Sequence, residues 1–215
     1  MFHAVFRSLF DRYGPQHWWP GETPFEVMVG AVLTQNTAWT NVERAIHNLK
    51  ANAALEPAAI VAARHEDLAG WLRPSGYFNV KAERLRGFCA WYLERGGLEA
   101  LSGVPTAALR ADLLAVKGIG PETADDILLY AFERPVFVID AYTRRLFSRL
   151  GQVRGDEPYE ELRARFEREL RGTDAERVAL YNEYHALIVR HAKEACRRRP
   201  ACEACPLAGT CAGPR

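Results

Sequence analysis

Only one stretch of this chain, RPVFVI at 134–139, is rich in residues that favour β-strands. It is too short and too isolated to build a sheet, because a stable sheet needs several paired strands. Elsewhere apolar residues recur at helical spacing, as in the stripe of Val5, Leu9 and Tyr13 near the N-terminus. The sequence therefore predicts an all-α fold of about ten helices, with 134–139 as an extended link into a helix.

Caps, prolines and glycines predict where the helices begin and end. Thr23 followed by Pro24 is a cap and a first-turn proline, and Thr37 is expected to cap the helix that runs to about Lys50. Gly96 and Gly97 are expected to end a long helix. The other helices are predicted at 56–63, 65–72, 79–95, 106–116, 121–132, 141–150, 157–171 and 174–195, with a loop at 73–76.

Composition excludes several classes of protein. With 48% hydrophobic and 26% charged residues the chain is neither disordered nor fibrous. A net charge of +1 argues against a uniformly basic nucleic-acid binder but permits a local basic patch. No apolar run approaches the roughly 20 residues that span a bilayer, and the N-terminal MFHAVFRSLFDRYG carries charges and no cleavage site. We therefore expect a soluble, cytoplasmic protein without a membrane partner.

Four of the five cysteines lie close together near the C-terminus, in the pattern C-x5-C-x2-C-x5-C. Four thiolates at this density can hold a [4Fe–4S] cluster or a tetrahedral zinc ion. A single C-x2-C pair favours the iron–sulfur cluster, with zinc as the alternative and a structural role for either. Arg197–Arg199 lie in the first loop and would either meet phosphates or remain a solvated charge run. The predicted ligands are Cys196, Cys202, Cys205 and Cys211, and Cys89 is expected to be a small core residue.

A glycine hairpin, Gly118–Gly120, separates two apolar helices in LLAVKGIGPETADDILLYA. The glycines permit a tight turn, and Ile119 is expected to anchor that turn in the core. The amides before the next helix would then face a phosphate, although such a turn is also common as a plain connection. Glu122 follows in the first turn of that helix, where an acid is unexpected beside a phosphate.

Asp140 comes eighteen residues after Glu122, at the end of the apolar run and the start of a helix. An ordinary N-cap is one interpretation. The other is a partly desolvated carboxylate that stabilises a cation or positions a water molecule.

Four segments taken together resemble the helix–hairpin–helix DNA glycosylases, the endonuclease III superfamily. They are VKGIGPETADDIL, VFVIDAYTRRLFSRLG, YHALIVRHAKEAC and the terminal cysteines. The usual cysteine spacing of the family is C-x6-C-x2-C-x5-C, so the first loop here is one residue shorter. The resemblance implies a two-domain endonuclease III-like (HhH-GPD) fold. Its six-helix domain would be 23–134, and 1–22 with 135–215 would form the cluster domain.

The resemblance also implies a role for each carboxylate. DNA would bind across the cleft between the domains with the target nucleotide flipped out. Asp140 matches the catalytic aspartate, which supports the cationic sugar or activates the attacking water. Glu122 occupies the position of the lysine that forms a Schiff base in bifunctional members. A carboxylate cannot form that imine, so the resemblance implies a monofunctional glycosylase with Asp140 and Glu122 as its catalytic carboxylates.

Within the superfamily, HWWPGETPFEVMVGAVLTQNT and RPSGYFNVKAERL resemble bacterial 3-methyladenine DNA glycosylases of type III. Those enzymes need not carry the cysteine cluster, so this chain combines features of two branches. The resemblance places the damaged base between Trp18 and Trp39, because aromatic faces attract a cationic alkylated base. Glu122 would favour the same positive charge. Aromatic packing is the other interpretation of Trp18, and the main one for Trp19.

Several polar residues have two interpretations each. Gln35 and Asn36 stand where the family inserts a polar wedge into the duplex, but they could also cap a helix end. Lys117 would contact a phosphate or carry a solvated charge, and Arg144 and Arg145 are expected at phosphates or at the surface. His185 is expected to make structural hydrogen bonds inside its helix. The predicted DNA contacts are thus Gly118, Ile119, Gly120, Lys117, Gln35 and Asn36.

These observations predict a base-excision-repair DNA glycosylase that acts on double-stranded DNA containing a damaged base. The expected substrate is an alkylated purine such as 3-methyladenine, and the expected enzyme is a monomer at the bacterial nucleoid. An endonuclease III-type glycosylase/AP lyase for oxidised pyrimidines is the alternative enzyme. A damaged-DNA-binding paralogue with little catalysis is the alternative outside the enzymes.

Overall fold

The computed structural model describes residues 1–18 and 21–213, and they divide between two compact units. The terminal unit comprises residues 1–18 and 134–215, and the central unit comprises residues 19–133. All regular structure among the described residues is helical, so the all-α prediction is confirmed. None of the helices described there is long and apolar enough to span a bilayer.

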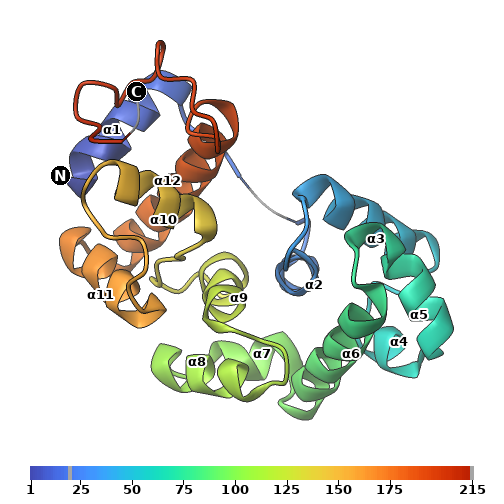
Figure 1. The fold of residues 1–215 in the computed structure, drawn as a ribbon. Coiled ribbons are helices and arrows are strands. Elements are labelled where there is room, and N and C mark those ends of the chain that lie inside the picture. The colour runs from blue at the N-terminus through green and yellow to red at the C-terminus, as the bar shows by residue number, and fades with distance from the viewer. Residues whose placement is uncertain (19–20, 214–215) are drawn as a thin grey trace. The chain divides into compact units, whose positions relative to one another are not determined.

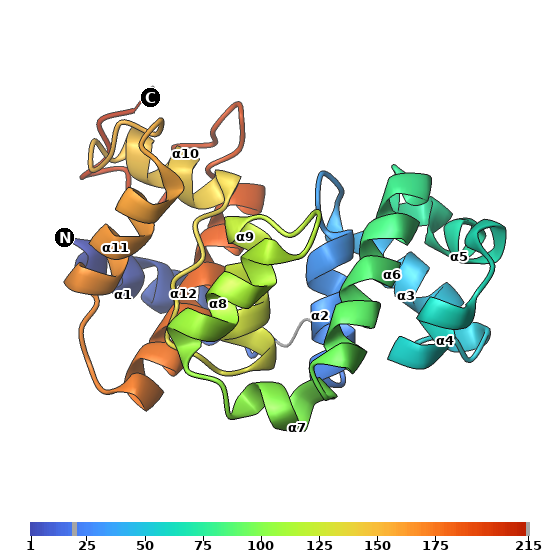
Figure 2. The same ribbon diagram turned by 90° about the horizontal axis from the view of Figure 1, so that it is seen from below.

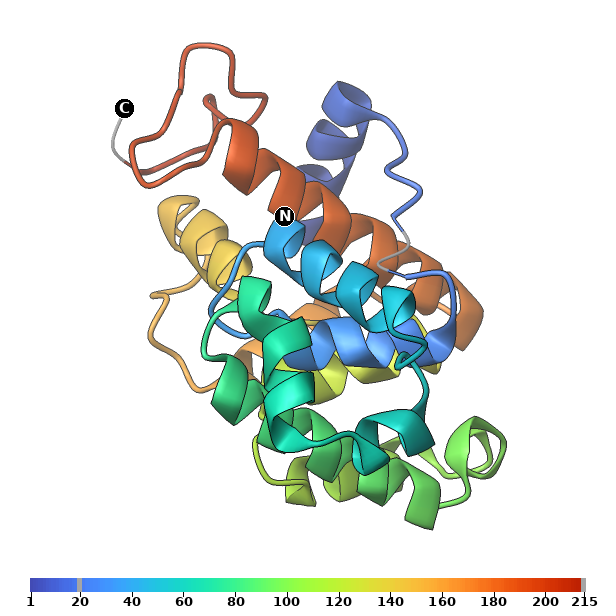
Figure 3. The same cartoon turned by 90° about the vertical axis from the view of Figure 1, so that its right-hand side faces the viewer.

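The terminal unit brings both ends of the chain together (Figure 1). Its helices are α1 (Phe2–Tyr13), α10 (Ala141–Arg149), α11 (Tyr159–Glu169) and α12 (Asp174–Glu194). α12 contacts both α1 and α10, and the cysteine tail loops beyond the C-terminal end of α12 (Figure 3). Aromatic rings fill the core between them: Phe137 stacks on Phe166 at 4.5 Å between ring centroids, and Phe2 stacks on Phe147 at 5.0 Å.

The extended link 134–139 confirms its prediction and shows how an isolated extended segment satisfies its backbone. Val136, Phe137, Val138 and Ile139 are buried. The Phe137 N–H donates to Glu167 Oε1 at 3.1 Å, and the Ile139 N–H donates to the Tyr159 hydroxyl at 3.3 Å. Side chains of α11 and its first turn therefore take the place of a neighbouring strand.

The central unit is a second, wholly helical unit. Its α-helices are α2 (Pro24–Leu33), α3 (Trp39–Ala51), α4 (Pro57–Ala62), α5 (His65–Leu72), α6 (Phe78–Glu94), α7 (Gly97–Ser102), α8 (Thr106–Ala115) and α9 (Pro121–Asp126). A 3-10 turn, η1 (Arg73–Ser75), precedes α6, and a π-helix, η2 (Ile127–Ala131), continues α9. The apolar α2 is buried along nearly its whole length and contacts α3, α6 and η2; Figure 2 shows α2 beside α6.

The predicted end of the long helix at Gly96 and Gly97 is confirmed, because α6 ends at Glu94. The helix α7, which was not predicted, begins at once at Gly97, and Leu101 anchors it in the core. The two glycines take positive φ angles of 82° and 72°, so they redirect the chain between two helices. The cap of α3 is Ala38 rather than Thr37, whose hydroxyl instead accepts a hydrogen bond from Asn41 at 3.2 Å.

Candidate functional site

Asp140 is a buried carboxylate at the N-cap of α10, immediately before its first residue. Its side chain accepts a hydrogen bond from the Thr143 N–H at 2.6 Å, so the N-cap interpretation is confirmed. The buried segment Val136–Ile139 leads directly into it, and Asp140 itself is only 8% exposed. A helix cap in this position is rigid because both its backbone and its side chain are fixed.

His185 of α12 faces Asp140. This contact was not predicted from the sequence. The distance from His185 Nε2 to Asp140 Oδ2 is 3.4 Å, and the Trp18 ring lies 5.7 Å from the imidazole, centroid to centroid. His185 was expected to make structural hydrogen bonds inside its helix, and the structure adds a contact with Asp140 outside it. Burial by itself would raise the pKa of Asp140, but the hydrogen bond and charge of His185, with the Thr143 bonds, hold that pKa below its ordinary 3.8. Asp140 is consequently a carboxylate at neutral pH.

The glycine hairpin lies in the central unit, between α8 and α9. Gly118 has a positive φ of 91°, and the Ile119 N–H donates to the Val116 carbonyl at 3.0 Å. Ile119 is 6% exposed, so its predicted role as the core anchor of the turn is confirmed. Lys117 and Gly120 are exposed on either side of it.

Glu122 differs from Asp140 in its surroundings. It lies in the first turn of α9 and is exposed, whereas Asp140 is buried. The helix cap beside it is Gly120, which has no side chain to bond the first-turn amides. The Glu122 carboxylate is therefore accessible to solvent, whereas that of Asp140 is not.

The Gln35 side chain is hydrogen-bonded to the glycine hairpin and to the first turn of α9. Its Nε2 donates to the Gly118 carbonyl and to the Thr123 hydroxyl, each at 3.0 Å, and its Oε1 accepts from Arg84. Asn36, the next residue, is exposed and has a positive φ of 56°. The two neighbours, which the sequence treated as a pair, therefore have different surroundings.

Trp39 lies at the first position of α3 and packs on α2. A Cβ added to Gly30 would meet the Trp39 ring at 2.9 Å, so the ring lies directly on the glycine. Trp39 also lines a cavity of about 440 Å³ together with Glu26, Glu43 and His47. Lys50 also lines this cavity and forms ion pairs of 2.9 Å with Glu22 and Glu26. Trp19, predicted to pack, lies outside the described residues.

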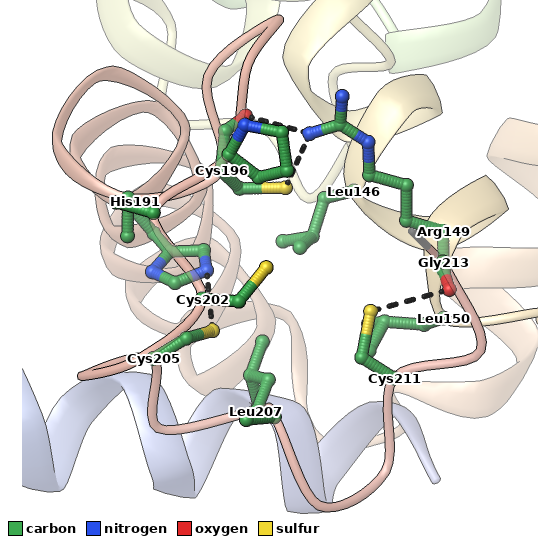
Figure 4. Close-up of a pocket in the computed structure, with 14 residues that line it drawn as sticks. Leu146, Arg149, Leu150, His191, Cys196, Cys202, Cys205, Leu207, Cys211 and Gly213 are labelled. Atoms are coloured by element: carbon green, nitrogen blue, oxygen red, sulfur yellow. Dashed lines mark hydrogen bonds between the residues drawn. The ribbon is translucent and has the colours of Figure 1, made fainter. Parts of the chain in front are cut away.

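The four predicted cysteine ligands line one small cavity of about 30 Å³ in the terminal unit. Figure 4 shows their sulfur atoms around this space, with Leu146, Leu150 and Leu207 as its apolar walls. Among the described residues, no group of three or more His, Cys, Asp or Glu side chains lies close enough together to bind a single metal ion. Four cysteine thiols around an apolar enclosure are the donor set of an iron–sulfur cluster, so the residues fit that group. As placed, they do not have the closer spacing that a single zinc ion requires.

Two residues around the cysteines were not predicted from the sequence. Arg149 donates to Cys196 Sγ at 3.2 Å, and its carbonyl accepts from Cys211 Sγ at 3.4 Å. His191 Nε2 lies 3.7 Å from Cys205 Sγ, and burial lowers the pKa of His191 to about 4, so it is neutral near pH 7. Neither residue belongs to the cysteine pattern, and the fold alone brings them there.

Other basic residues have structural partners. Arg144 donates to the Glu157 carbonyl at 2.7 Å, and Arg145 donates to the Cys196 carbonyl at 2.9 Å. Both arginines are half-buried and tie α10 to neighbouring backbone, and their expected place at phosphates or at the surface stays a prediction. Arg197–Arg199 are exposed. Cys89 is fully buried and burial raises its pKa to about 12, as expected of a core thiol.

Known proteins match this chain over most of its length. It is 45% identical to the "Putative DNA repair glycosylase MJ1434" of Methanocaldococcus jannaschii, over 98% of this chain and 96% of that protein. It is 29% identical to endonuclease III of Thermotoga maritima, over 98% of this chain and 92% of that one.

Solved structures show the same similarity. The 3-methyladenine DNA glycosylase MagIII of H. pylori, bound to 1,N6-ethenoadenine, has a TM-score of 0.76 and 32% identity, covering 90% of this chain and 97% of its own. An endonuclease III–DNA complex has a TM-score of 0.82 at 21% identity, over 97% of this chain and 92% of that one, which shows the shared fold.

The family match covers residues of both units. Residues 29–171 match the HhH-GPD superfamily of base excision DNA repair proteins, a span that includes both the glycine hairpin and Asp140 and ends before the cysteines. Together with the helical fold and the relatives over the whole chain, this match identifies the protein as a base-excision-repair DNA glycosylase of the HhH-GPD superfamily.

Proposed function

We propose that this glycosylase is monofunctional and that it hydrolyses the N-glycosidic bond of an alkylated purine, with Asp140 as its main catalytic carboxylate. The observation that carries the proposal is the environment of Asp140. It is buried, held by the Thr143 N–H at 2.6 Å and ionised at neutral pH. A fixed anion in a low-dielectric site stabilises the positive charge that develops on the sugar as the bond breaks. The same carboxylate can orient the attacking water.

The residue at the hairpin supports hydrolysis without strand cleavage. In bifunctional relatives a lysine at the position of Glu122 attacks C1′ and forms a Schiff base. Glu122 carries a carboxylate, which has no amine to form that imine. The exposure of Glu122 on α9 leaves it accessible to a bound nucleotide.

The aromatic residues support a cationic base as the substrate. Purines alkylated on a ring nitrogen carry a positive charge, which favours stacking on tryptophan. Trp39 lines a cavity that also contains the carboxylates of Glu26 and Glu43. Trp18 lies next to His185, the residue that faces Asp140. The similarity to MagIII, which is named as a 3-methyladenine DNA glycosylase, supports an alkylated purine of this kind.

The DNA contacts of the proposal lie in the central unit. Gly118, Ile119 and Gly120 would present the hairpin backbone to a phosphate, and the exposed Lys117 and Asn36 would contact the duplex nearby. The domains that carry these contacts and the chemistry would be 23–134, and 1–22 with 135–215.

The proposed cofactor is a [4Fe–4S] cluster held by Cys196, Cys202, Cys205 and Cys211. When bound, it would supply a covalent cross-link among segments of the tail that have no regular secondary structure of their own. Arg149 would balance part of the negative charge of the thiolates, because it already donates to Cys196 Sγ.

The cofactor is tested by metal analysis of the purified protein and of Cys205→Ser. We expect iron, sulfide and visible absorbance in the wild type and a loss of iron in the variant. The unfolding temperature of the variant should fall by roughly 10 °C or more, since a metal centre contributes several kcal/mol and each 1 kcal/mol corresponds to about 2–4 °C. A colourless protein with stoichiometric zinc would contradict the cluster and support the alternative.

The activity is tested by base release from three duplexes that carry 3-methyladenine, an oxidised pyrimidine or no lesion. The proposal predicts release from the first duplex only. Release of the oxidised pyrimidine alone would favour the endonuclease III-type activity, to which the 29% identity with endonuclease III points. Tight binding of damaged duplex without release of any base would favour a damage-binding protein.

A further inference from the structure

Arg84 of α6 lies against the backbone of the glycine hairpin. A Cβ added to Gly118 would stand 2.6 Å from Arg84 Cγ and 2.7 Å from Cδ, so the aliphatic part of the arginine occupies the space that a side chain would need. Gly118 also has a φ of 91°, which favours glycine. The close packing of Arg84 on the hairpin therefore requires a glycine at position 118.

Gln35 fixes the direction of the Arg84 guanidinium. Arg84 Nη1 donates to Gln35 Oε1, while Gln35 Nε2 donates to the Gly118 carbonyl and to the Thr123 hydroxyl at 3.0 Å each. The orientation of the amide is determined by its partners, because a guanidinium can only donate and a carbonyl can only accept. One amide therefore joins the arginine to the hairpin.

The charge of Arg84 is not balanced by an acid. Among the described residues no carboxylate forms an ion pair with it, whereas Arg110 on the neighbouring α8 pairs with Asp125 at 2.6 Å. Lys81, one turn earlier on α6, is buried and donates to the carbonyls of Leu33 and Ser75, at 2.8 and 2.6 Å. Burial, and then the charge of Arg84, lower the pKa of Lys81 to about 8.

From this geometry we infer that Arg84 binds a phosphate of the DNA backbone beside the hairpin, and that Gln35 is the positioning residue that aims it. Arg84 as a residue is half-buried, and the fork of a guanidinium suits two phosphate oxygens. The inference rests on the proposed binding of duplex DNA at the hairpin. It adds a side-chain cation to the backbone amides that the sequence predicted.

Salt-dependent binding tests the inference. The affinity of the full-length protein for an undamaged duplex and for a duplex with a tetrahydrofuran abasic analogue is measured by anisotropy over a range of NaCl concentrations. Each phosphate contact contributes roughly 0.9 to the slope of log K against log salt. We expect Arg84→Gln to reduce this slope by about 1, and Arg84→Lys, which keeps the charge, to retain most of it.

A matched control separates the effect of removing the charge beside the hairpin from the effect of lowering the net charge of the protein. Arg95→Gln removes the same charge from the end of the same helix, where Arg95 is exposed and pairs with Asp112 at 2.8 Å. It should leave the slope unchanged. Thermal unfolding shows whether each variant is folded, and Arg84→Lys supplies the comparison if Arg84→Gln is not.

The positioning role is tested by combining variants. Gln35→Leu should reduce the slope in the wild type, because the guanidinium is no longer fixed, but not further in the Arg84→Gln background. A folded Arg84→Gln protein with the wild-type slope would overturn the phosphate contact and leave Arg84 as a structural brace. Additive slope changes would overturn the role of Gln35. A wild-type protein without affinity for either duplex would instead contradict the proposed function.

Discussion

The starts of α9 and α10 have the same backbone and opposite chemistry. Gly120 precedes α9 with φ and ψ of −94° and 176°, and Asp140 precedes α10 with −93° and 178°. Asp140 caps its helix with its own carboxylate, whereas Gly120 has no side chain to do so. The start of α10 is therefore capped by a fixed carboxylate. The start of α9 has no side-chain cap, and the neighbouring Glu122 is exposed.

This difference supports the different tasks that we propose for the two acids. Asp140 is fixed by Thr143 and faces His185, so its charge and position are set before any substrate binds. Glu122 is exposed on a helix start that belongs to the hairpin. We interpret the first acid as the one that stabilises the reacting sugar, and the second as the one that determines whether the strand is cleaved after base release.

Replacement of Asp140 should have the largest effect. Asp140→Asn keeps a good helix cap, because asparagine caps as well as aspartate, but it removes the negative charge. Single-turnover base release should fall by about 10²–10⁴-fold, the range of a positioned catalytic group. The dissociation constant for duplex DNA should stay within about threefold. Asp156→Asn, at an exposed aspartate that pairs with Arg154 at 3.1 Å, is the control. Unchanged release in a folded Asp140→Asn protein would remove Asp140 from catalysis.

The reverse exchange at the hairpin should produce a new activity. Glu122→Lys places an amine at the position where bifunctional relatives have their lysine. With an abasic duplex and borohydride, we expect a trapped covalent adduct that the wild type does not form. Glu122→Gln is the control, because it removes the acid without supplying an amine. If Glu122→Lys gives no adduct, the position of Glu122 is not equivalent to that of the lysine.

The hairpin glycines should differ in their effect on stability. Gly118→Ala places a methyl group at 2.6 Å from Arg84 and forces a positive φ on alanine. This should cost about 1–3 kcal/mol of unfolding free energy, measured by urea denaturation. Gly120→Ala meets no atom within 4 Å and has a negative φ, so it should cost less than about 1 kcal/mol. Equal losses at the two positions would contradict the fit between Arg84 and Gly118.

The smallest expected effect is a change in pH dependence. The contacts of His185 and Thr143 outweigh burial and keep the pKa of Asp140 below 3.8, so wild-type release should not lose activity through this group above about pH 4. His185→Ala removes one of the contacts that lower the pKa of Asp140, while the burial that raises this pKa remains. The pKa of Asp140 should therefore rise in this variant. The acidic limb of the rate profile would then move to higher pH. A profile identical to that of the wild type would show that His185 does not support the carboxylate.

Local sequence signals predicted most of the fold. The cap and proline at Thr23 and Pro24 mark the start of α2, and the Thr23 hydroxyl accepts from Glu26 at 3.1 Å as such a cap should. The buried Ile119 was predictable from one apolar residue between two glycines. The short α7 was missed because the glycines before it are a common end of a helix and give no sign that another begins.

The contacts between distant residues could not be predicted in the same way. Asp140 and His185, Gln35 and Arg84, and Cys196 and Arg149 are each more than 40 residues apart in the chain. Each pair meets because two segments pack, and neither member carries a signal for the other. The motifs thus predict which residues belong to the candidate site, whereas the fold determines which side chains contact them.

Borohydride trapping with the wild-type protein tests the division between the two acids most directly. The protein is incubated with a duplex carrying 3-methyladenine, and base release, strand cleavage and covalent adduct are measured in the same reaction. The account predicts base release with an intact strand and no adduct. Release accompanied by a trapped adduct and strand cleavage would contradict it, since another amine of the chain would then perform the step that Glu122 cannot.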